Sequence, residues 1–447
     1  MIPALRPYQV AAIEQARAHL AAGCRAPVIV GPTGMGKTTI GASIARAHLE
    51  RGGEGVLWLA HRKELVEQAA DRLEQFGMTV GVIAAGSRRV NPFARVQVAM
   101  VQTLRARGEY PKASLIIPDE AHHYVAQDWQ VIPQAYPHAL RVGLTATPER
   151  GDGQGLRGVF DCMVVATTVR ELTELGFLVP LKVVGPPRAL ASKEIAQRPV
   201  DAYLEHARGR RTIVFAPHVK AARVFLDEFL AAGVRAALVH GELASLERSE
   251  ILRRYRRGEI DVLVNVNVLT EGFDDPATSC CILARGCGTA GMFIQIVGRI
   301  LRPAPGKLGA MLIDLRGVVH VHGHPSKDWE FSLDGRAIRQ GEAMPEGRLC
   351  TVCGAVYVDG RCPDCGRAPN ELEAPTVVKV KLEHLRWERL RQDEDSVRVE
   401  RLAKWFREAQ ARGFKEGFAL NKYRVVYGDW PPWKIKQAAA QAARRAA

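Results

Sequence analysis

Short apolar runs alternate with helix-compatible stretches in two successive series, and this rhythm constrains the fold more than any other feature of the sequence. The first series runs from residue 26 to about 147 and includes APVIVG, GVLWLAH and SLIIPDEA. The second runs from 212 to 315 and includes TIVFA, DVLVNV and GAMLIDL. Continuous Val, Ile and Leu runs separated by helices indicate a parallel sheet buried on both faces. A link rich in Gly and Pro separates the series, so we expect two α/β lobes in tandem with a boundary near residues 185–200.

The length of 447 residues suggests about three folding units. We predict four segments, which are a first lobe over 1–185, a second lobe over 200–325, a small cysteine-containing unit over 345–370 and a basic helical tail over 376–447. The tail holds 17 Lys and Arg against 9 Asp and Glu, a surplus of 8 out of the net charge of +14. This charge favours a polyanionic partner such as nucleic acid, although a basic balance can also reflect a solvated surface.

The N-terminal sequence has no basic patch followed by an apolar run, and no stretch of about 18 consecutive apolar residues occurs. We therefore expect a soluble, cytoplasmic protein without a membrane partner. Five of the nine cysteines are scattered through apolar contexts, where we expect buried free thiols. They are Cys24, Cys162, Cys280, Cys281 and Cys287.

A glycine-rich stretch, GPTGMGKT at residues 31–38, follows the first apolar run and precedes a helix-compatible stretch. This is the context that a Walker A loop requires. The glycines let backbone N–H groups surround phosphates, and the N-terminus of the following helix adds its positive dipole. We expect Lys37 to contact the β and γ phosphates and Thr38 to bind Mg²⁺ through its hydroxyl.

Two carboxylates, Asp119 and Glu120, end the apolar run SLIIP and begin the sequence DEAH. They should emerge at the C-terminal edge of a parallel strand, where ligands bind in such sheets. We expect Asp119 to hold Mg²⁺ and Glu120 to orient or activate the attacking water. Pro118 is unusual here because it removes a backbone donor where a central strand ends.

Two arginines stand three positions apart in the segment QIVGRILRP, residues 295–303, far downstream of the phosphate loop. In a helix, Arg299 and Arg302 would share one face. A distant pair of this kind suggests that a second lobe closes over the nucleotide. The arginines would then neutralise charge on the transferring phosphoryl group.

Together these motifs resemble those of superfamily 2 DEAD/DEAH-type helicases. Nine stretches occur in the order of the superfamily's motifs over roughly residues 5 to 303, namely LRPYQ, GPTGMGKT, AHRKELVEQ, VQTL, PDEAH, TATPER, FAPHVKAA, LTEGFDDP and QIVGRILRP. The resemblance is greatest to RadD-type and phage-encoded ATP-dependent DNA helicases, on the basis of LRPYQ, EGFDDP, QIVGRILRP and four cysteines clustered after the second lobe. XPB-like translocases share part of the pattern. The resemblance implies two RecA-like lobes, ATP as the nucleotide and Mg²⁺ as its metal ion.

The resemblance also implies roles for single positions, with Gln9 reading adenine and Lys37, Thr38, Asp119, Glu120, Arg299 and Arg302 serving catalysis. Nucleotide contacts would come from Arg6, Tyr8, Gln9, Gly31, Thr33, Gly34, Gly36, Lys37, Thr38, Thr39, Asp119, Gly272 and Asp275. Hydrolysis would be coupled to lobe movement by Thr145, Thr147 and Gln295. The phosphate backbone of a bound strand would be lined by His61, Arg62, Gln102 and Thr103.

The remaining four cysteines form two CxxC pairs eight residues apart, Cys350, Cys353, Cys362 and Cys365. Thiolates at this spacing can close a tetrahedral Zn²⁺ site, and a glycine directly after each pair allows the tight turns. Four protein ligands leave no open position, so we expect a structural zinc ribbon. The ribbon could touch nucleic acid, dock a protein partner or brace the tail.

The tail places Val399, Leu402, Trp405 and Phe406 at spacings that form one helical face. We expect this stripe to pack as a core with a solvated opposite side. The basic surplus still makes the tail a candidate contact for DNA or a protein partner.

The sequence therefore predicts an ATP-hydrolysing DNA helicase or double-strand translocase that acts on single-stranded, duplex or branched DNA in repair, recombination or replication. QIVGRILRP departs from the RNA-remodelling DEAH enzymes, whose corresponding motif usually ends in a glycine-rich arginine run. An RNA helicase is nevertheless the first alternative. A non-catalytic DNA-binding or partner-recruiting scaffold and the motor subunit of a restriction-type complex are the others.

Overall fold

Most of the chain is described by a computed structural model. The described residues are 2–124, 129, 131–148, 155–191, 193–270, 272–327, 329, 331–334, 348–349, 356–357, 374–411, 417–420, 423 and 431–445. They form two compact units, one over residues 1–383 and one over 384–447. None of the helices among them combines the length and apolar character needed to span a membrane.

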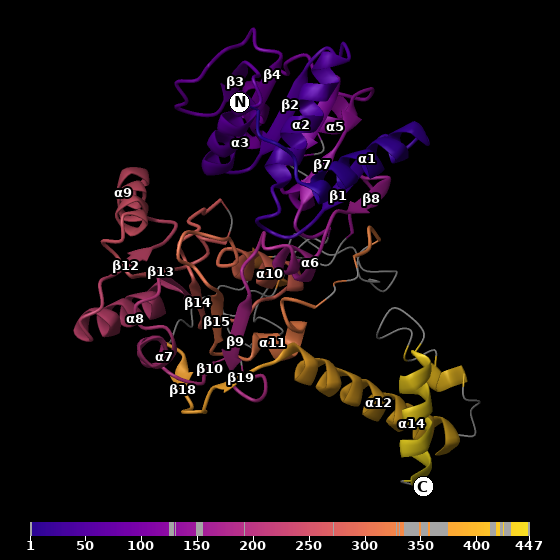
Figure 1. Cartoon of the computed structure of the whole chain (residues 1–447), viewed down its shortest axis with the longest axis vertical. Coiled ribbons are helices and arrows are strands. Elements are labelled where there is room, and N and C mark those ends of the chain that lie inside the picture. The colour runs from indigo at the N-terminus through magenta and orange to yellow at the C-terminus, as the bar shows by residue number, and fades with distance from the viewer. Residues whose placement is uncertain are drawn as a thin grey trace. The chain divides into compact units, whose positions relative to one another are not determined.

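The first lobe is built on parallel strands with helices packed around them (Figure 1). Its strands are β1 (Pro27–Val30), β2 (Val56–Ala60), β3 (Val80–Ile83), β4 (Val96–Met100), β5 (Leu115–Pro118), β6 (Leu140–Arg141), β7 (Gly143–Thr145) and β8 (Cys162–Val165). Its helices are α1 (Pro7–Ala21), α2 (Lys37–Glu50), α3 (Lys63–Gln75), α4 (Val101–Arg107), the 3-10 turn η1 (Ala121–His123), α5 (Val131–Ala135) and α6 (Val169–Glu174).

These strands pair in the orders β3-β4-β2-β5-β6 and β7-β1-β8, and every pairing between them is parallel. A parallel bridge between Asp119 and Leu144 connects the end of β5 to β7. The strands read as continuous apolar runs because both faces are buried, and β1, β2 and β5 are buried along their whole length. Pro118 is accommodated because it is the last residue of β5, and the following N–H, that of Asp119, donates to the Leu59 carbonyl at 2.9 Å.

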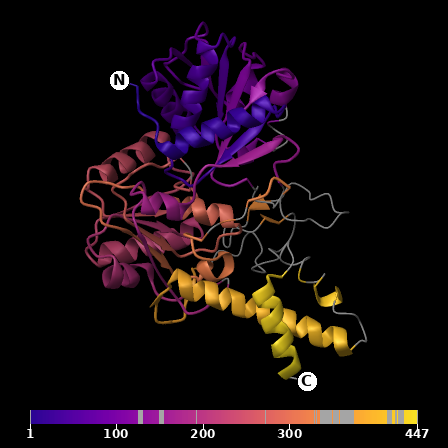
Figure 2. The same cartoon turned by 45° about the vertical axis from the view of Figure 1, so that its right-hand side comes forward.

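The second lobe repeats the α/β design around one seven-stranded sheet of order β12-β13-β11-β14-β15-β9-β19. Its strands are β9 (Leu181–Gly185), β11 (Thr212–Phe215), β12 (Ala236–Val239), β13 (Val262–Asn265), β14 (Cys280–Leu283), β15 (Ala310–Asp314) and β19 (Glu383–His384). Its helices are α7 (Pro199–His206), α8 (Val219–Ala231), α9 (Ser245–Arg256), α10 (Ala290–Gly298) and α11 (Val318–His322). The turned view again separates the indigo-to-magenta strands of the first lobe from the magenta-to-orange strands of the second (Figure 2).

The boundary between the lobes differs from the predicted one. Strand β9 falls inside the predicted first lobe, yet Leu181–Val184 pairs in parallel with Ala310–Ile313 of β15. A short parallel pair, β10 (Glu194–Ile195) with β18 (Thr376–Val377), likewise brings the start of the predicted tail to the second lobe. The two α/β lobes are thus confirmed, whereas the second sheet begins before the predicted boundary near residues 185–200.

The second compact unit contains α12 (Trp387–Ala411) and α14 (Trp433–Arg445). Its core includes Leu402, which is fully buried, and Val399, Trp405 and Phe406 pack against that core. The predicted apolar stripe is therefore a packed helix face. A separate antiparallel pair joins β16 (Arg348–Leu349) to β17 (Val356–Tyr357).

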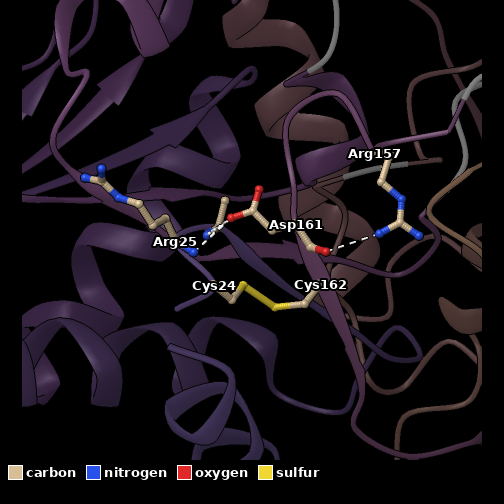
Figure 3. The surroundings of a disulfide bond; sticks show 6 residues. Cys24, Arg25, Arg157, Asp161 and Cys162 are labelled. Carbon is tan, nitrogen blue, oxygen red and sulfur yellow. Dashed lines mark hydrogen bonds between the residues drawn. A yellow bond between two sulfur atoms is a disulfide. The ribbon is translucent and has the colours of Figure 1, made fainter. Parts of the chain in front are cut away.

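The prediction of free thiols was wrong for two of the five scattered cysteines, because Cys24 and Cys162 form a disulfide (Figure 3). Parallel pairing places Pro27 of β1 opposite Cys162 of β8, so the chain entering β1 passes beside β8. The Asp161 carboxylate supports this junction by accepting the backbone N–H of Arg25 at 2.8 Å. The other three, Cys280, Cys281 and Cys287, are buried free thiols as predicted, and burial raises their pKa values.

Candidate nucleotide site between the two lobes

The glycine-rich loop connects β1 to α2 in the geometry of a phosphate cradle. Gly34 and Gly36 have φ angles of 94° and 87°, in the left-handed region that favours glycine. A Cβ at Gly36 would also lie 2.5 Å from Nε2 of Gln9. The loop can therefore keep its backbone amides at the N-terminus of α2, which begins at Lys37.

Lys37 lies in this loop with its Nζ donating to the Gly31 carbonyl at 3.2 Å. Burial lowers the pKa of its amine, and the nearby carboxylates of Glu120 and Asp119 oppose that shift. An ammonium desolvated in this way gains from a polyanion beside it, because the charged form is then stabilised. The position suits contact with the phosphates of a nucleotide.

Asp119 and Glu120 follow β5 directly and are only 6% and 8% exposed. Burial raises the pKa of Asp119 to about 7, with a further increase from the charge of Glu120. Glu120 has φ of 49°, and its backbone N–H donates to Asp119 Oδ1 at 3.0 Å. Two carboxylates held so close favour a cation between them and the phosphates, so the donor set with Lys37 and Thr38 fits Mg²⁺ and a nucleoside triphosphate.

The Thr145 hydroxyl connects Thr147 to the DEAH segment. Thr145 Oγ1 donates to the Thr147 carbonyl at 2.7 Å and accepts the Thr147 N–H at 3.2 Å. His122 Nδ1 lies 3.1 Å from the same oxygen. The end of β7 is thereby connected to the segment that carries Glu120, and the coupling role of Thr145 and Thr147 remains a prediction.

The N-terminal motif packs against the phosphate loop. Gln9 accepts the Arg6 backbone N–H at 2.9 Å and donates from Nε2 to the Met35 carbonyl at 2.9 Å. Tyr8 donates to the same carbonyl at 2.8 Å and accepts from Arg6 Nη1 at 3.0 Å. The Arg6 guanidinium lies 4.2 Å from the centre of the Phe177 ring. Phe177 is an aromatic support for Arg6 that the sequence motifs did not predict.

The second lobe contributes α10 and the residues that follow it. Gln295 Nε2 lies 3.4 Å from Glu120 Oε2, and a Cβ at Gly298 would lie 2.5 Å from the Cβ of Thr33. Glycine therefore allows α10 to approach the phosphate loop closely. Gln295, which was predicted to couple hydrolysis to lobe movement, therefore contacts the DEAH segment at Glu120.

The prediction that Arg299 and Arg302 share a helix face was wrong, because α10 ends at Gly298. Arg299 is 6% exposed and donates three hydrogen bonds to backbone carbonyls, two to Thr270 and one to Phe273. Arg302 instead pairs with the Asp274 carboxylate, and burial lowers the pKa of Arg302 to about 10. The two arginines reach the site from separate supports on the second lobe.

One cavity of about 550 Å³ brings these groups together. Residues from both lobes line it, and among them are Arg6, Gln9, Thr33, Gly34, Gly36, Lys37, Thr38, Thr39, Asp119, Glu120, Asp274, Arg299 and Arg302. The predicted catalytic set is thus assembled at one place. The fold and this cavity define a two-lobed nucleotide-driven motor.

Some predicted nucleotide contacts lie elsewhere. The Asp275 carboxylate accepts from Arg211 Nη1 at 3.3 Å and from the Thr278 hydroxyl at 2.7 Å, and its neighbour Asp274 lines the cavity instead. Gly272 has φ of 74°, and its carbonyl accepts from Gln68 Nε2 of the first lobe at 3.0 Å. Gly272 therefore belongs to the lobe contact.

The residues predicted to line a nucleic-acid strand lie at two helix starts of the first lobe. His61 and Arg62 precede α3, and Arg62 Nη1 donates to the Val268 carbonyl of the second lobe at 3.1 Å. Gln102 and Thr103 lie in the first turn of α4, where Gln102 is exposed. The strand-contact role remains a prediction for all four.

The four cysteines of the predicted zinc ribbon, Cys350, Cys353, Cys362 and Cys365, lie outside the described residues. The zinc site therefore stays a prediction.

Comparison with known families identifies both lobes. Residues 2–150 match the family described as "Type III restriction enzyme, res subunit", and residues 196–304 match the helicase conserved C-terminal domain. The chain belongs to the superfamily 2 helicases and is a helicase-type ATP-dependent motor.

Relatives agree with this assignment. A 51.5 kDa protein of a Lactococcus phage is 29% identical over 92% of this chain and 95% of its own length. The ATP-dependent helicase IRC3 of Saccharomyces cerevisiae is 28% identical over 71% of this chain, which spans 52% of that relative. The chain thus spans nearly all of the phage protein and about half of the yeast one.

Solved structures share the fold. A fragment of an HsdR subunit of a type I restriction enzyme from Vibrio vulnificus has a TM-score of 0.59 at 24% identity, covering 72% of this chain and 66% of that one. Dbp5 of Saccharomyces cerevisiae, solved with RNA and ADP BeF3, has a TM-score of 0.52 at 18% identity, covering 73% of this chain and 93% of that one.

Proposed function

We propose that the protein is an ATP-dependent DNA helicase or double-strand DNA translocase. The observation that carries this proposal is the single cavity in which Lys37, Asp119 and Glu120 of the first lobe meet Arg299 and Arg302 of the second. A site completed by two lobes can turn nucleotide binding and release into lobe closure and opening. Alternating grips on a strand would then produce stepping.

Each residue has a role in this cycle. Lys37 would hold the β and γ phosphates, Thr38 and Asp119 would hold Mg²⁺, and Glu120 would orient the attacking water. The metal ion would neutralise phosphate charge when bound. Deprotonation of Asp119, whose pKa is raised to about 7, would accompany that binding.

The arginines would complete the site from the second lobe. Arg302 is paired with Asp274, so a γ-phosphate would compete with this carboxylate for the guanidinium. Arg299 is held by hydrogen bonds to the backbone carbonyls of Thr270 and Phe273. Its contact with the γ-phosphate would therefore depend on the position of the loop that carries these two residues. This arrangement would link phosphate occupancy to the second lobe, as the proposed motor requires.

Several observations favour DNA as the track. The chain carries a net charge of +14, which suits a polyanion. One structure with the same fold is a type ISP restriction-modification enzyme, LlaBIII, bound to DNA, with a TM-score of 0.51. Part of the chain, 27%, is 31% identical to UvrABC system protein B of Thermotoga maritima. A role in repair, recombination or replication, or as the motor of a restriction-type complex, fits these relatives.

RNA is the second candidate track, because Dbp5 was solved with RNA and shares the fold. A panel of polynucleotides separates the two. Steady-state ATP hydrolysis would be measured with single-stranded DNA, duplex DNA, forked DNA and RNA of matched length. We expect stimulation by DNA that disappears in Lys37→Ala and Glu120→Gln. Stimulation by RNA alone would make the protein an RNA helicase, and no hydrolysis under any condition would leave the scaffold alternative.

We also propose that Cys350, Cys353, Cys362 and Cys365 hold a structural Zn²⁺. The antiparallel strands β16 and β17 flank the first CxxC pair in the sequence, and short antiparallel strands beside such pairs are typical of a zinc ribbon. The ribbon and the basic C-terminal unit would serve as additional contacts for DNA or for a protein partner.

A further inference from the structure

Three histidine rings form a continuous stack beside the nucleotide site. The His122 and His123 ring centres are 4.2 Å apart and tilted by 40°. The His123 and His61 ring centres are also 4.2 Å apart, with a tilt of 47°. His123 is therefore the middle ring, and it belongs to none of the motifs that the sequence identified.

The sheet explains why these rings meet. His61 directly follows β2, and η1, which carries His122 and His123, follows β5. Strands β2 and β5 pair in parallel, so their C-terminal ends lie side by side at the edge of the sheet. The segment that precedes α3 is thus placed against the DEAH segment by backbone pairing.

One end of the stack leads to the catalytic carboxylate. The Thr145 hydroxyl donates to the Thr147 carbonyl, so its oxygen must accept from His122, and His122 carries a proton on Nδ1. The same Nδ1 lies 3.6 Å from Glu120 Oε2. The orientation of the His122 ring therefore affects its contacts with both Glu120 and Thr145.

The other end leads to the predicted strand contact and to the second lobe. His61 is followed by Arg62, whose Nη1 bonds to the Val268 carbonyl at 3.1 Å. Gln68, on the same helix α3, bonds to the Gly272 carbonyl at 3.0 Å. A strand that engages His61 would act on a segment that is already in contact with both the DEAH box and the second lobe.

We propose that His123 is a positioning residue that couples nucleic-acid binding at His61 to the His122–Glu120 pair. The inference rests on the proposed function, since it concerns how a bound strand stimulates ATP hydrolysis at the same site. Its ring transmits displacement of His61 to His122 by packing. It touches neither the phosphates nor the water in this scheme.

The test is a double-mutant cycle on the full-length chain. ATP hydrolysis would be measured with and without saturating DNA in wild type, His123→Leu, His61→Ala and the double variant. We expect the stimulation by DNA to be about tenfold smaller in each single variant than in wild type, which is within the usual range of coupling between two sites. The double variant should lose no more than either single one, because both act through one stack.

Two further variants separate coupling from structure. His123→Phe keeps a ring of similar shape and should retain most of the stimulation, whereas a simple loss of stability would show equally in the rate without DNA. His138→Ala, at an exposed histidine of the same lobe, is the matched control. If His123→Leu does not fold, His123→Gln replaces it in the cycle.

The outcomes are distinguishable. Additive losses in the double variant, or wild-type stimulation in His123→Leu, would overturn the coupling role of His123. A wild-type protein that no polynucleotide stimulates would instead overturn the proposed function.

Discussion

Replacing Asp119 with Asn should stabilise the nucleotide-free protein in a pH-dependent way. Burial, with the charge of Glu120, raises the pKa of Asp119 from 3.8 to about 7. A carboxyl whose pKa is raised on folding contributes stability below its unfolded pKa and loses it as the pH rises through the folded pKa. Asn cannot ionise, so the free energy of unfolding of Asp119→Asn should exceed that of wild type by an amount that grows with pH.

The magnitude follows from the two pKa values. At about 1.4 kcal/mol per pKa unit, ionisation of Asp119 lowers the free energy of unfolding by about 4 kcal/mol at pH 8 and about 2 kcal/mol at pH 5. The gap between Asp119→Asn and wild type should therefore widen by about 2–3 kcal/mol between these pH values. For a lobe of this size, that corresponds to roughly 5–10 °C in the unfolding midpoint.

The assay is thermal unfolding at pH 5 and pH 8 without nucleotide and with a chelator of divalent cations. Glu14→Gln, at an exposed carboxyl of α1, is the control and should show the same difference from wild type at both pH values. An Asp119→Asn advantage that does not change with pH would refute the argument, because it would mean that Asp119 ionises in the folded protein as it does in the unfolded chain.

Three other predictions concern the core, the second lobe and the metal. Leu333 is 3% exposed and packs in the core of the first lobe. Leu333→Ala should therefore lower the free energy of unfolding, measured by urea titration, by about 2–5 kcal/mol. Leu308→Ala, at a 93% exposed side chain, is the control and should change this free energy little. Arg302→Ala should reduce DNA-stimulated ATP hydrolysis by about 10³-fold. Arg17→Ala, on the exposed face of α1, is the control and should leave the rate unchanged. An unaltered rate in Arg302→Ala would show that this arginine does not belong to the catalytic site. Elemental analysis should find stoichiometric zinc, and a purified protein without zinc would rule out the ribbon at residues 345–370.

Local patterns allowed much of the fold and site to be predicted. Lys37, Asp119 and Glu120 could be placed because each follows an apolar run that ends at the same edge of a parallel sheet. Burial on both faces makes such strands readable as continuous runs. The tail stripe around Leu402 was predictable for a related reason, since helical spacing alone gathers its members on one face.

What the sequence did not reveal depends on tertiary contacts. Helix α10 ends at Gly298, four residues before Arg302, and Arg299 bonds instead to carbonyls of a distant loop. The Cys24–Cys162 disulfide depends on the register between β1 and β8, which no local pattern encodes.

Several contacts between residues that lie far apart in the sequence also could not be predicted. Phe177 supports Arg6 from a segment that carries no motif, and Leu333 returns from beyond the second lobe to the core of the first. His123 follows a recognisable motif, but its contact with His61 arises from the pairing of β2 with β5. Each of these contacts required the strand order, which the sequence rhythm leaves open.

The rate of ATP hydrolysis with and without duplex DNA, in wild type and in Arg299→Ala, tests the central claim most directly. We expect duplex DNA to stimulate the wild type strongly and Arg299→Ala to abolish that stimulation while the protein remains folded. Equal stimulation of both proteins would contradict a site completed by the second lobe, and a wild type that DNA does not stimulate would contradict a DNA motor.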